Sequence, residues 1–260
     1  KISLPLDLLL VASANPEDYT NRGRIITPLK DRFGSQIRTH YPLDADTEIA
    51  IMRQEARPLS IGETTVELPD YLERVVATFS QLARSSSSIN QRSGVSVRLS
   101  VSNAEVIGAN AMRRALRAGE HHVVPRVSDL EALAASSSGK IEIESMDDGR
   151  EGQLLEQLVK AAVLTVYREV VDPTKLTNVV VAFEAGKVAH SGEAVTSAEL
   201  AGLCEEIAPL AEAVESLIGS NQDEPARAAA VEFILEGLHL SKRLNKDTSA
   251  TSSTYRGRNA

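Results

Sequence analysis

Hydrophobic residues near the start of the chain form one short, nearly continuous run. Residues 4–11 consist mainly of Leu and Val, and turn-forming residues and Pro16 follow them. A run without alternation is typical of a strand covered on both faces, as in the parallel sheet of an α/β domain. A second short strand is expected over residues 36–41, where Pro42 ends it.

From residue 44 onward the hydrophobic positions follow helical spacing. The apolar residues of the segment 68–84 recur every three or four positions and so form one face of a helix. Ser102 or Asn103 can cap a further helix, which Gly119 closes. Residues 177–183 fit either a strand or a buried helix. The same periodicity predicts helices over residues 44–56, 127–135, 151–171, 197–219 and 224–246.

Two segments are expected to lack regular helices. Residues 136–150 are rich in serine, glycine and acids and are interpreted as a linker, with a short alternating stretch at 141–144 that could add an edge strand. Residues 248–260 are rich in Ser and Thr and are predicted to be a disordered tail. The fold class expected is therefore α/β at the start followed by an all-α region.

Composition narrows the functional classes. The chain has 28 basic and 36 acidic residues, a net charge of −8, which disfavours nucleic-acid binding and a membrane-surface role. No apolar run is long enough to cross a membrane. The single cysteine, Cys204, cannot form an internal disulfide, so a reducing compartment and a cytoplasmic location are expected.

Asn15 follows the first predicted strand. Ligands of open α/β sheets bind at the carboxyl ends of strands, where an Asn side chain could orient a water molecule or contact a phosphate. The pair Asn15-Pro16 is also a common way to turn a chain, and the residues alone support both interpretations equally.

Two motifs near the start carry a family resemblance. Residues 12–16 read ASANP and residues 29–33 read LKDRF. They resemble the A-[ST]-x-N-P strand end and the L-x-D-R-F motif of AAA+ ATPases, within the clade of the magnesium-chelatase ATPase subunit and the MoxR-type proteins. The resemblance implies that Asn15 is the sensor-1 residue, which positions the attacking water, and that Arg32 is the arginine finger of the neighbouring subunit's site. Arg22 or Arg24 could take the same role, and Arg32 could instead be a surface arginine paired with Asp31.

A third motif lies further along the chain. Residues 94–98 read GVSVR and are similar to the G-[VL]-S-x-R segment that supplies the sensor-2 arginine in this clade. Arg98 would then contact the γ-phosphate of its own subunit's ATP. An arginine near a helix N-terminus lies at the unfavourable end of the helix dipole, so an anionic partner is expected. The alternative is a surface arginine that is solvated or paired with Glu105.

The resemblance covers about the first 135 residues and implies a division of the chain. Residues 1–43 would be the C-terminal part of an AAA+ parallel-sheet core, 44–135 a helical lid, 136–150 a linker, 151–247 a helical C-terminal extension and 248–260 the tail. Such proteins form homo-oligomeric rings, commonly hexamers, that bind ATP and Mg²⁺ between subunits. Hydrolysis drives remodelling of a partner or metal insertion into it, and the partner is often a protein with a von Willebrand A-type domain.

The phosphate-binding motifs of such an ATPase are absent. The sequence contains no G-x-x-x-x-G-K-[ST] loop and no apolar strand ending in two acids. The first residue is Lys rather than Met, so we expect those motifs to precede it, and we expect this chain not to hydrolyse ATP unaided. The alternative from another class is a non-catalytic helical adaptor, or a degenerate AAA+ fragment. A transcriptional AAA+ activator is a third reading, but no basic recognition helix follows.

Overall fold

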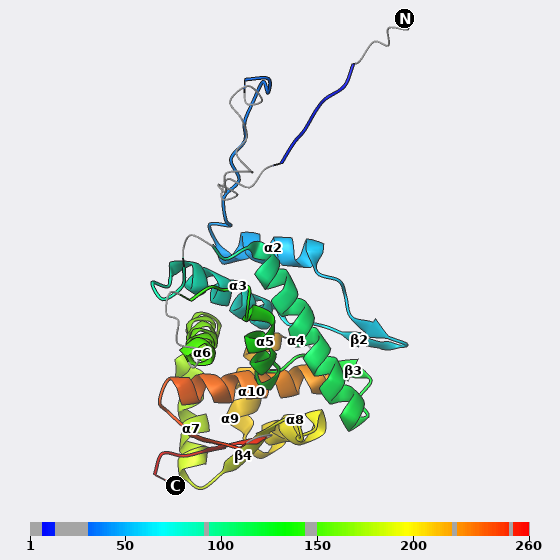
Figure 1. Ribbon diagram of the computed structural model, residues 1–260. Helices are drawn as coiled ribbons and strands as arrows, with labels where there is room; N and C mark the ends of the chain where they lie inside the picture. Colours follow the sequence, from blue (N-terminus) through cyan, green and yellow to red (C-terminus); the bar gives the residue numbers. More distant parts are fainter. Residues whose placement is uncertain are drawn as a thin grey trace, which may run out of the picture. The chain divides into compact units, whose positions relative to one another are not determined.

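The computed structural model describes residues 7–13, 31–90, 94–143, 150–219, 223–249 and 252–259. The chain divides into two compact units, Lys1–His40 and Tyr41–Ala260, each of which is described by itself (Figure 1). This division lies close to the predicted boundary at residue 43.

The described part of the first unit, residues 7–13 and 31–40, contains no helix or strand. Leu9 and Val11 expose 90% and 81% of their surface. The parallel-sheet core predicted over residues 1–43 is therefore not formed by the described residues. The physical reason is that a buried strand needs neighbouring strands for its backbone hydrogen bonds and a covering layer for its side chains, and these residues supply neither.

The second unit begins with three packed helices, α2 (Ala45–Glu55), α3 (Asp70–Ser85) and α4 (Val97–Ala118). Asp44 caps α2 by accepting a hydrogen bond from the backbone of Thr47, at 2.7 Å. Helix α4 begins nearly two turns before the predicted start, because Ser96 rather than Ser102 or Asn103 is its cap. Gly119 ends it with a φ of 72°, as expected of a glycine C-cap.

The predicted helix over residues 127–135 is a 3₁₀ helix, η1 (Val127–Ala132), continued by α5 (Leu133–Ser137). The chain then stays packed, since Ile141 is buried and pairs with Ser138, and Ile143 pairs with Ile89. The described part of the predicted linker, residues 136–143, is therefore ordered against the helices. The serine-rich composition of this segment suggested a linker, because composition alone does not reveal which backbone groups pair.

Six further elements complete the helical part. They are α6 (Arg150–Val170), η2 (Pro173–Leu176), α7 (Thr177–Glu184), α8 (Ser197–Glu206), α9 (Ala208–Ile218) and α10 (Glu224–Leu240). Residues 177–183 thus form a helix rather than a strand. The single helix predicted over 197–219 is two helices, and Pro209 lies in the first turn of the second, where its missing N–H is no loss.

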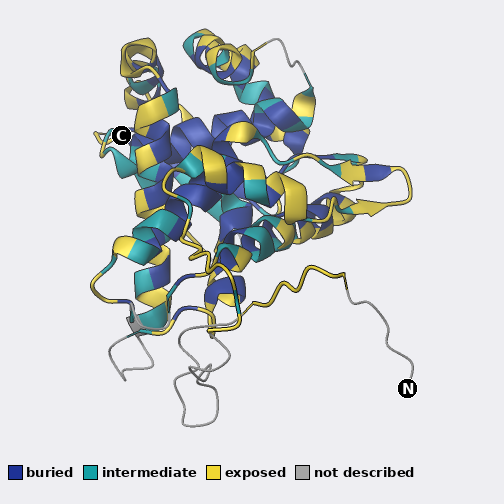
Figure 2. Cartoon of the chain, turned by 90° about the horizontal axis from the view of Figure 1, so that it is seen from above, coloured by how far each residue is buried: buried dark blue, intermediate teal, exposed yellow. Residues whose placement is uncertain are grey.

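Helix α10 is the central element of the second unit. Its residues from Ala228 to Leu238 are buried throughout, and α6, α8 and α9 pack around it (Figures 1 and 2). The ring of Phe233 on α10 lies 4.7 Å from that of Tyr71 on α3. One hydrophobic core therefore takes residues from both the predicted lid and the predicted extension. The helices of the predicted lid and of the predicted extension therefore lie within one unit, Tyr41–Ala260, and share its hydrophobic core.

Two small sheets accompany the helices. In the first, β1 (Ser60–Ile61) pairs antiparallel with β2 (Thr64–Val66), which pairs in parallel with β3 (His122–Val123). In the second, β6 (Ser252–Arg256) lies between β4 (Val188–Gly192) and β5 (Asn245–Thr248), antiparallel to both. The second sheet overturns the prediction of a disordered tail over 248–260.

The tail is ordered because β6 is paired on both sides and anchored by one aromatic residue. Tyr255 is fully buried, and its hydroxyl donates a hydrogen bond to Glu236 of α10 at 2.6 Å. The described part of the chain contains no helix with the length and apolar character needed to cross a bilayer.

Candidate functional site

Only two of the three residues predicted to act on ATP lie among the residues that the structure describes. Asn15, like the alternatives Arg22 and Arg24, lies outside the described residues. Arg32 is exposed and belongs to the first unit, whereas Arg98 is exposed and belongs to the second. Each of the two arginines is therefore considered within its own unit.

Arg98 is the second residue of α4, on the first turn of the helix. The side chain of Ser96 caps this end and accepts a hydrogen bond from the backbone N–H of Arg98 at 3.3 Å. Helices α2 and α3 carry acids in their first turns, but α4 carries none. Glu105 accepts a hydrogen bond from the backbone of Arg57 instead of pairing with Arg98. Among the described residues, the guanidinium of Arg98 has no ion pair or hydrogen bond.

The other residues of the GVSVR motif have structural tasks. Gly94 has a φ of +68°, and a Cβ there would collide with the hydroxyl of Tyr41, so both the backbone and the space favour glycine. Val95 is buried, and its carbonyl accepts a hydrogen bond from Arg84 Nε at 2.9 Å. Ser96 is the helix cap. Arg98 is thus a motif residue whose side chain the described fold does not use.

A buried ionic cluster supports the helix end that carries Arg98. Glu48 of α2 is fully buried, and the two guanidinium nitrogens of Arg84 on α3 bind its two carboxylate oxygens at 2.6 and 2.7 Å. Ser100 of α4 donates to the same carboxylate and lies 2.7 Å from the hydroxyl of Ser80 on α3. A bidentate pair of this kind is geometrically specific. The cluster therefore holds α2, α3 and the first turn of α4 in one arrangement.

A second buried cluster lies at the other end of α4. Arg126 is fully buried and donates to the carbonyl of Val195 at 2.7 Å and to the hydroxyl of Ser197 at 2.6 Å. Arg114 of α4 donates to Asp129 at 3.2 Å, and Asp129 also accepts from the backbone of Arg126. Burial and the neighbouring Arg114 lower the pKa of the Arg126 guanidinium. These bonds join α4 and η1 to the start of α8.

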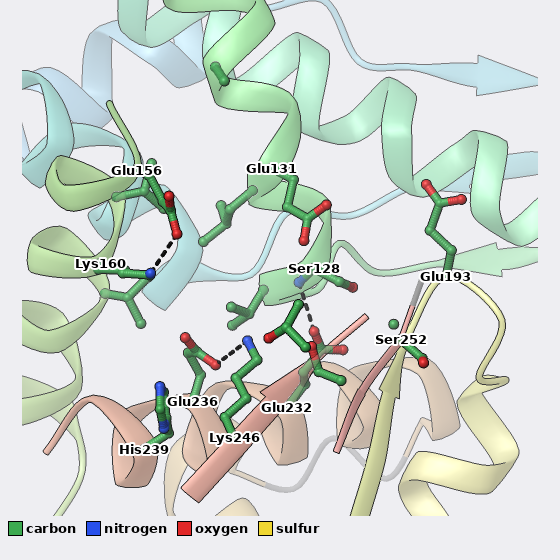
Figure 3. Close-up of a pocket in the computed structure, with 18 of the residues that line it drawn as sticks. Ser128, Glu131, Glu156, Lys160, Glu193, Glu232, Glu236, His239, Lys246 and Ser252 are labelled. Atoms are coloured by element: carbon green, nitrogen blue, oxygen red, sulfur yellow. Dashed lines mark hydrogen bonds and ion pairs between the residues drawn. The ribbon is translucent and has the colours of Figure 1, made fainter. Parts of the chain in front are cut away.

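A cavity of about 490 Å³ opens between η1, α5, α6, α10 and the second sheet (Figure 3). One wall is apolar, because Leu155, Val159 and Val163 follow one face of α6. The charged lining is mostly acidic. It contains Glu131, Glu156, Glu193, Glu232 and Glu236, against Lys160, Lys246 and His239.

Most of these acids already have a cationic partner. Lys160 binds Glu156 at 2.5 Å and Lys246 binds Glu236 at 2.8 Å, as the dashed lines of Figure 3 mark. Glu193 binds Arg113 and Arg117. The described residues place no cation within ion-pair distance of the two remaining acids, Glu131 and Glu232.

Glu232 is the most unusual of the lining residues. Only 2% of its surface is exposed, and its Oε1 accepts a hydrogen bond from the backbone N–H of Ser128 at 2.7 Å. Its Oε2 is buried without a hydrogen-bond partner, as is the hydroxyl of Ser128. Burial raises the pKa of Glu232, with Asp129 adding to the effect and Arg126 opposing it. Burial likewise raises the pKa of Glu131.

Sequence reasoning did not find this cavity. The one local signal is that Glu232 and Glu236 lie one turn apart within a stretch, residues 228–238, that is otherwise apolar apart from Gly237. The cavity walls come from segments that the sequence interpretation had assigned to a lid, an extension and a tail. Comparison of the chain with known protein families, with curated proteins and with solved structures finds no match.

Proposed function

We propose that this chain is the C-terminal part of a magnesium-chelatase-like AAA+ ATPase, which couples ATP hydrolysis in a homo-oligomeric ring to remodelling of a partner protein or metal insertion into it. In this proposal Arg98 is the sensor-2 arginine, Arg32 the arginine finger and Asn15 the sensor-1 residue. A protein with a von Willebrand A-type domain is the kind of partner that the family resemblance implies.

One observation carries the proposal. Arg98 projects from the first turn of α4 without a partner among the described residues, on a helix end held in place by Glu48 and Arg84. Nearby arginines of the same helices are engaged, since Arg53 binds Asp70. An exposed guanidinium without a partner at a helix N-terminus favours an anion, and a terminal phosphate fits this chemistry.

ATP and Mg²⁺ are held mainly by other residues in this proposal. The described residues contain no group of three His, Cys, Asp or Glu placed to hold a metal ion. The proposal assigns the metal and the inner phosphates to a phosphate loop and a pair of acids, neither of which occurs in this sequence. Arg98 would contact only the terminal phosphate and sense whether it is present.

The hydrophobic core shared by the predicted lid and extension bears on how a movement of Arg98 would be transmitted. Arg98 stands on helices that share one hydrophobic core with α6 and α10. A nucleotide-dependent movement of Arg98 would therefore carry the whole of residues 41–260 as one body, and so transmit the change to a partner bound to its C-terminal helices.

The test uses the longer protein, with ATP binding and hydrolysis measured separately. Arg98→Ala should lower kcat at least tenfold, and Arg32→Ala should lower it by on the order of a thousandfold or more while nucleotide binding is retained. Arg117→Ala, an exposed arginine on the last turn of α4, is the matched control and should leave turnover unchanged. Wild-type turnover in Arg32→Ala and Arg98→Ala would refute the assignment.

A non-catalytic adaptor is the competing function. It is supported by the absence of a phosphate loop from this sequence. If the coding sequence upstream of Lys1 contains no phosphate loop, and the longer protein binds no nucleotide, the adaptor interpretation is correct. Arg98 would then be a solvated surface arginine.

A further inference from the structure

A second site lies in the cavity between α6, α10, η1 and the second sheet, and it does not rest on the nucleotide proposal. We propose that this cavity binds a small organic cation, an alkyl chain carrying a primary ammonium group, with Glu232 and Ser128 as the buried ligands and the apolar face of α6 against the chain.

The cavity is lined by two buried polar groups whose hydrogen-bonding capacity is not used. A buried carboxylate oxygen and a buried hydroxyl, Glu232 Oε2 and Ser128 Oγ, both lack hydrogen-bond partners. A buried polar atom without a partner destabilises a fold, so most such atoms are satisfied by protein, water or ligand. An ammonium group has three donors and can satisfy the carboxylate and the hydroxyl together.

The charged side chains that line the cavity are mostly acidic. Five carboxylates line the cavity against two lysines, and both lysines are already bound to acids of the cavity, Glu156 and Glu236. The site therefore disfavours a phosphate or carboxylate ligand. The two internal pairs also show the kind of group that the remaining acids, Glu131 and Glu232, can hold, namely an ammonium.

The shape and lining of the cavity bear on the same ligand. Leu155, Val159 and Val163 of α6 provide an apolar strip along the cavity. The two acids without a cationic partner lie on other elements, Glu131 on η1 and Glu232 on α10 (Figure 3). Pockets for small ligands combine apolar walls with a few polar groups that orient the ligand. A bare metal ion fits less well, because the described residues bring no three acids, histidines or cysteines together.

Binding also involves a proton. Burial favours the neutral form of Glu232 in the free protein, and an ammonium next to it favours the carboxylate. The incoming cation therefore replaces a proton, which leaves the Glu232 carboxyl for the solvent. Affinity should rise with pH until Glu232 is ionised in the free protein.

The experiment is calorimetric titration of the whole chain with putrescine, a four-carbon diamine. Butylamine tests the need for the second amine, and butanediol, which has the same length without charge, is the neutral control. We expect putrescine and butylamine to bind, and butanediol not to. Glu232→Gln keeps the acceptor for the Ser128 backbone and should weaken putrescine binding at least about tenfold.

Glu212→Gln is the matched control, since it removes the same charge from an exposed position on α9 outside the cavity, and it should bind putrescine as the wild type does. Glu131→Gln alters an acid at the cavity that is more accessible than Glu232, and it should weaken binding by about two- to fivefold even if Glu232→Gln fails to fold. The proposal is overturned if butanediol binds as well as the amines, if both cavity variants keep wild-type affinity, or if no amine binds at millimolar concentration.

Discussion

Arg126 donates a hydrogen bond to the hydroxyl of Ser197, 2.6 Å away and 71 residues further along the chain. The arginine precedes η1 and the serine begins α8, so one buried side chain joins the segment predicted as a lid to the segment predicted as an extension. Glu120 strengthens the junction by accepting from the backbone of Ser197 at 2.7 Å. The two regions therefore share a polar junction in addition to a hydrophobic core.

Removing this junction should destabilise the fold. Arg126→Met removes a buried cation that lies beside Glu120, and it leaves the carbonyl of Val195 and the hydroxyl of Ser197 without their donor. We expect a loss of about 3–5 kcal/mol in the free energy of unfolding, measured by urea denaturation. Arg168→Met, at an exposed position on α6, should change it by no more than about 0.5 kcal/mol. Equal effects of the two substitutions would show that the junction contributes little.

Two glycine substitutions should act in opposite directions. Gly94→Ala places a Cβ at a φ of +68° and against Tyr41, so we expect a destabilisation of about 1–2 kcal/mol. Gly202→Ala lies inside α8 with open space around it, so it should stabilise by about 0.5–1 kcal/mol. Thermal unfolding of the two variants beside the wild type checks both signs. A stabilised Gly94→Ala would mean that the turn before α4 can adopt another conformation.

The C-terminal strand should contribute to stability. Tyr255→Phe removes the hydroxyl that donates to the buried Glu236, and we expect a loss of about 1–2 kcal/mol. Ser253→Ala, a half-buried position on the same strand, is the control and should have little effect. Hydrogen exchange of the β6 amides gives an independent measurement, because a paired central strand is protected and a disordered tail is not.

The buried carboxyl of Glu232 should give the unliganded protein a defined pH dependence. Its pKa is raised on folding, so the folded chain holds this proton more tightly than the unfolded chain does. Stability is then lost as the pH rises from the ordinary carboxyl value of about 4.5 through the folded-state pKa. Over this range the wild type should lose stability through Glu232, whereas the Glu232→Gln variant should not. The free energy of unfolding of the variant should therefore increase relative to that of the wild type as the pH rises. A difference that stays constant with pH would contradict the raised pKa.

The helices were the most predictable part of this protein. Apolar spacing located α3 and α6, and the local chemistry of Asp44 and Gly119 marked one helix start and one helix end. The start of α4 was missed because several serines and an asparagine could act as its cap. In the structure Leu99 and Ser100 are buried on the first turns of the helix, which favours Ser96 as its cap. Their burial cannot be inferred from the neighbouring residues in the sequence.

Of the two candidate sites, the sequence revealed only one. The exposed Arg98 was found from its motif, because the motif is contiguous in the sequence. The cavity around Glu232 was not found, because its walls come from helices and strands that are far apart in the chain. The one local signal, two acids one turn apart in a mostly apolar stretch, does not show that Glu232 lines a cavity.

The sequence by itself therefore determined where most of the helices lie and which residues form the GVSVR motif, since periodicity, caps and turns act over a few residues. Only the tertiary structure decided that lid and extension share one core, that the last residues form a paired strand, and that Arg126 and Glu232 are buried. These outcomes depend on free energies of burial and pairing between segments far apart in the chain, to which a local pattern makes no reference.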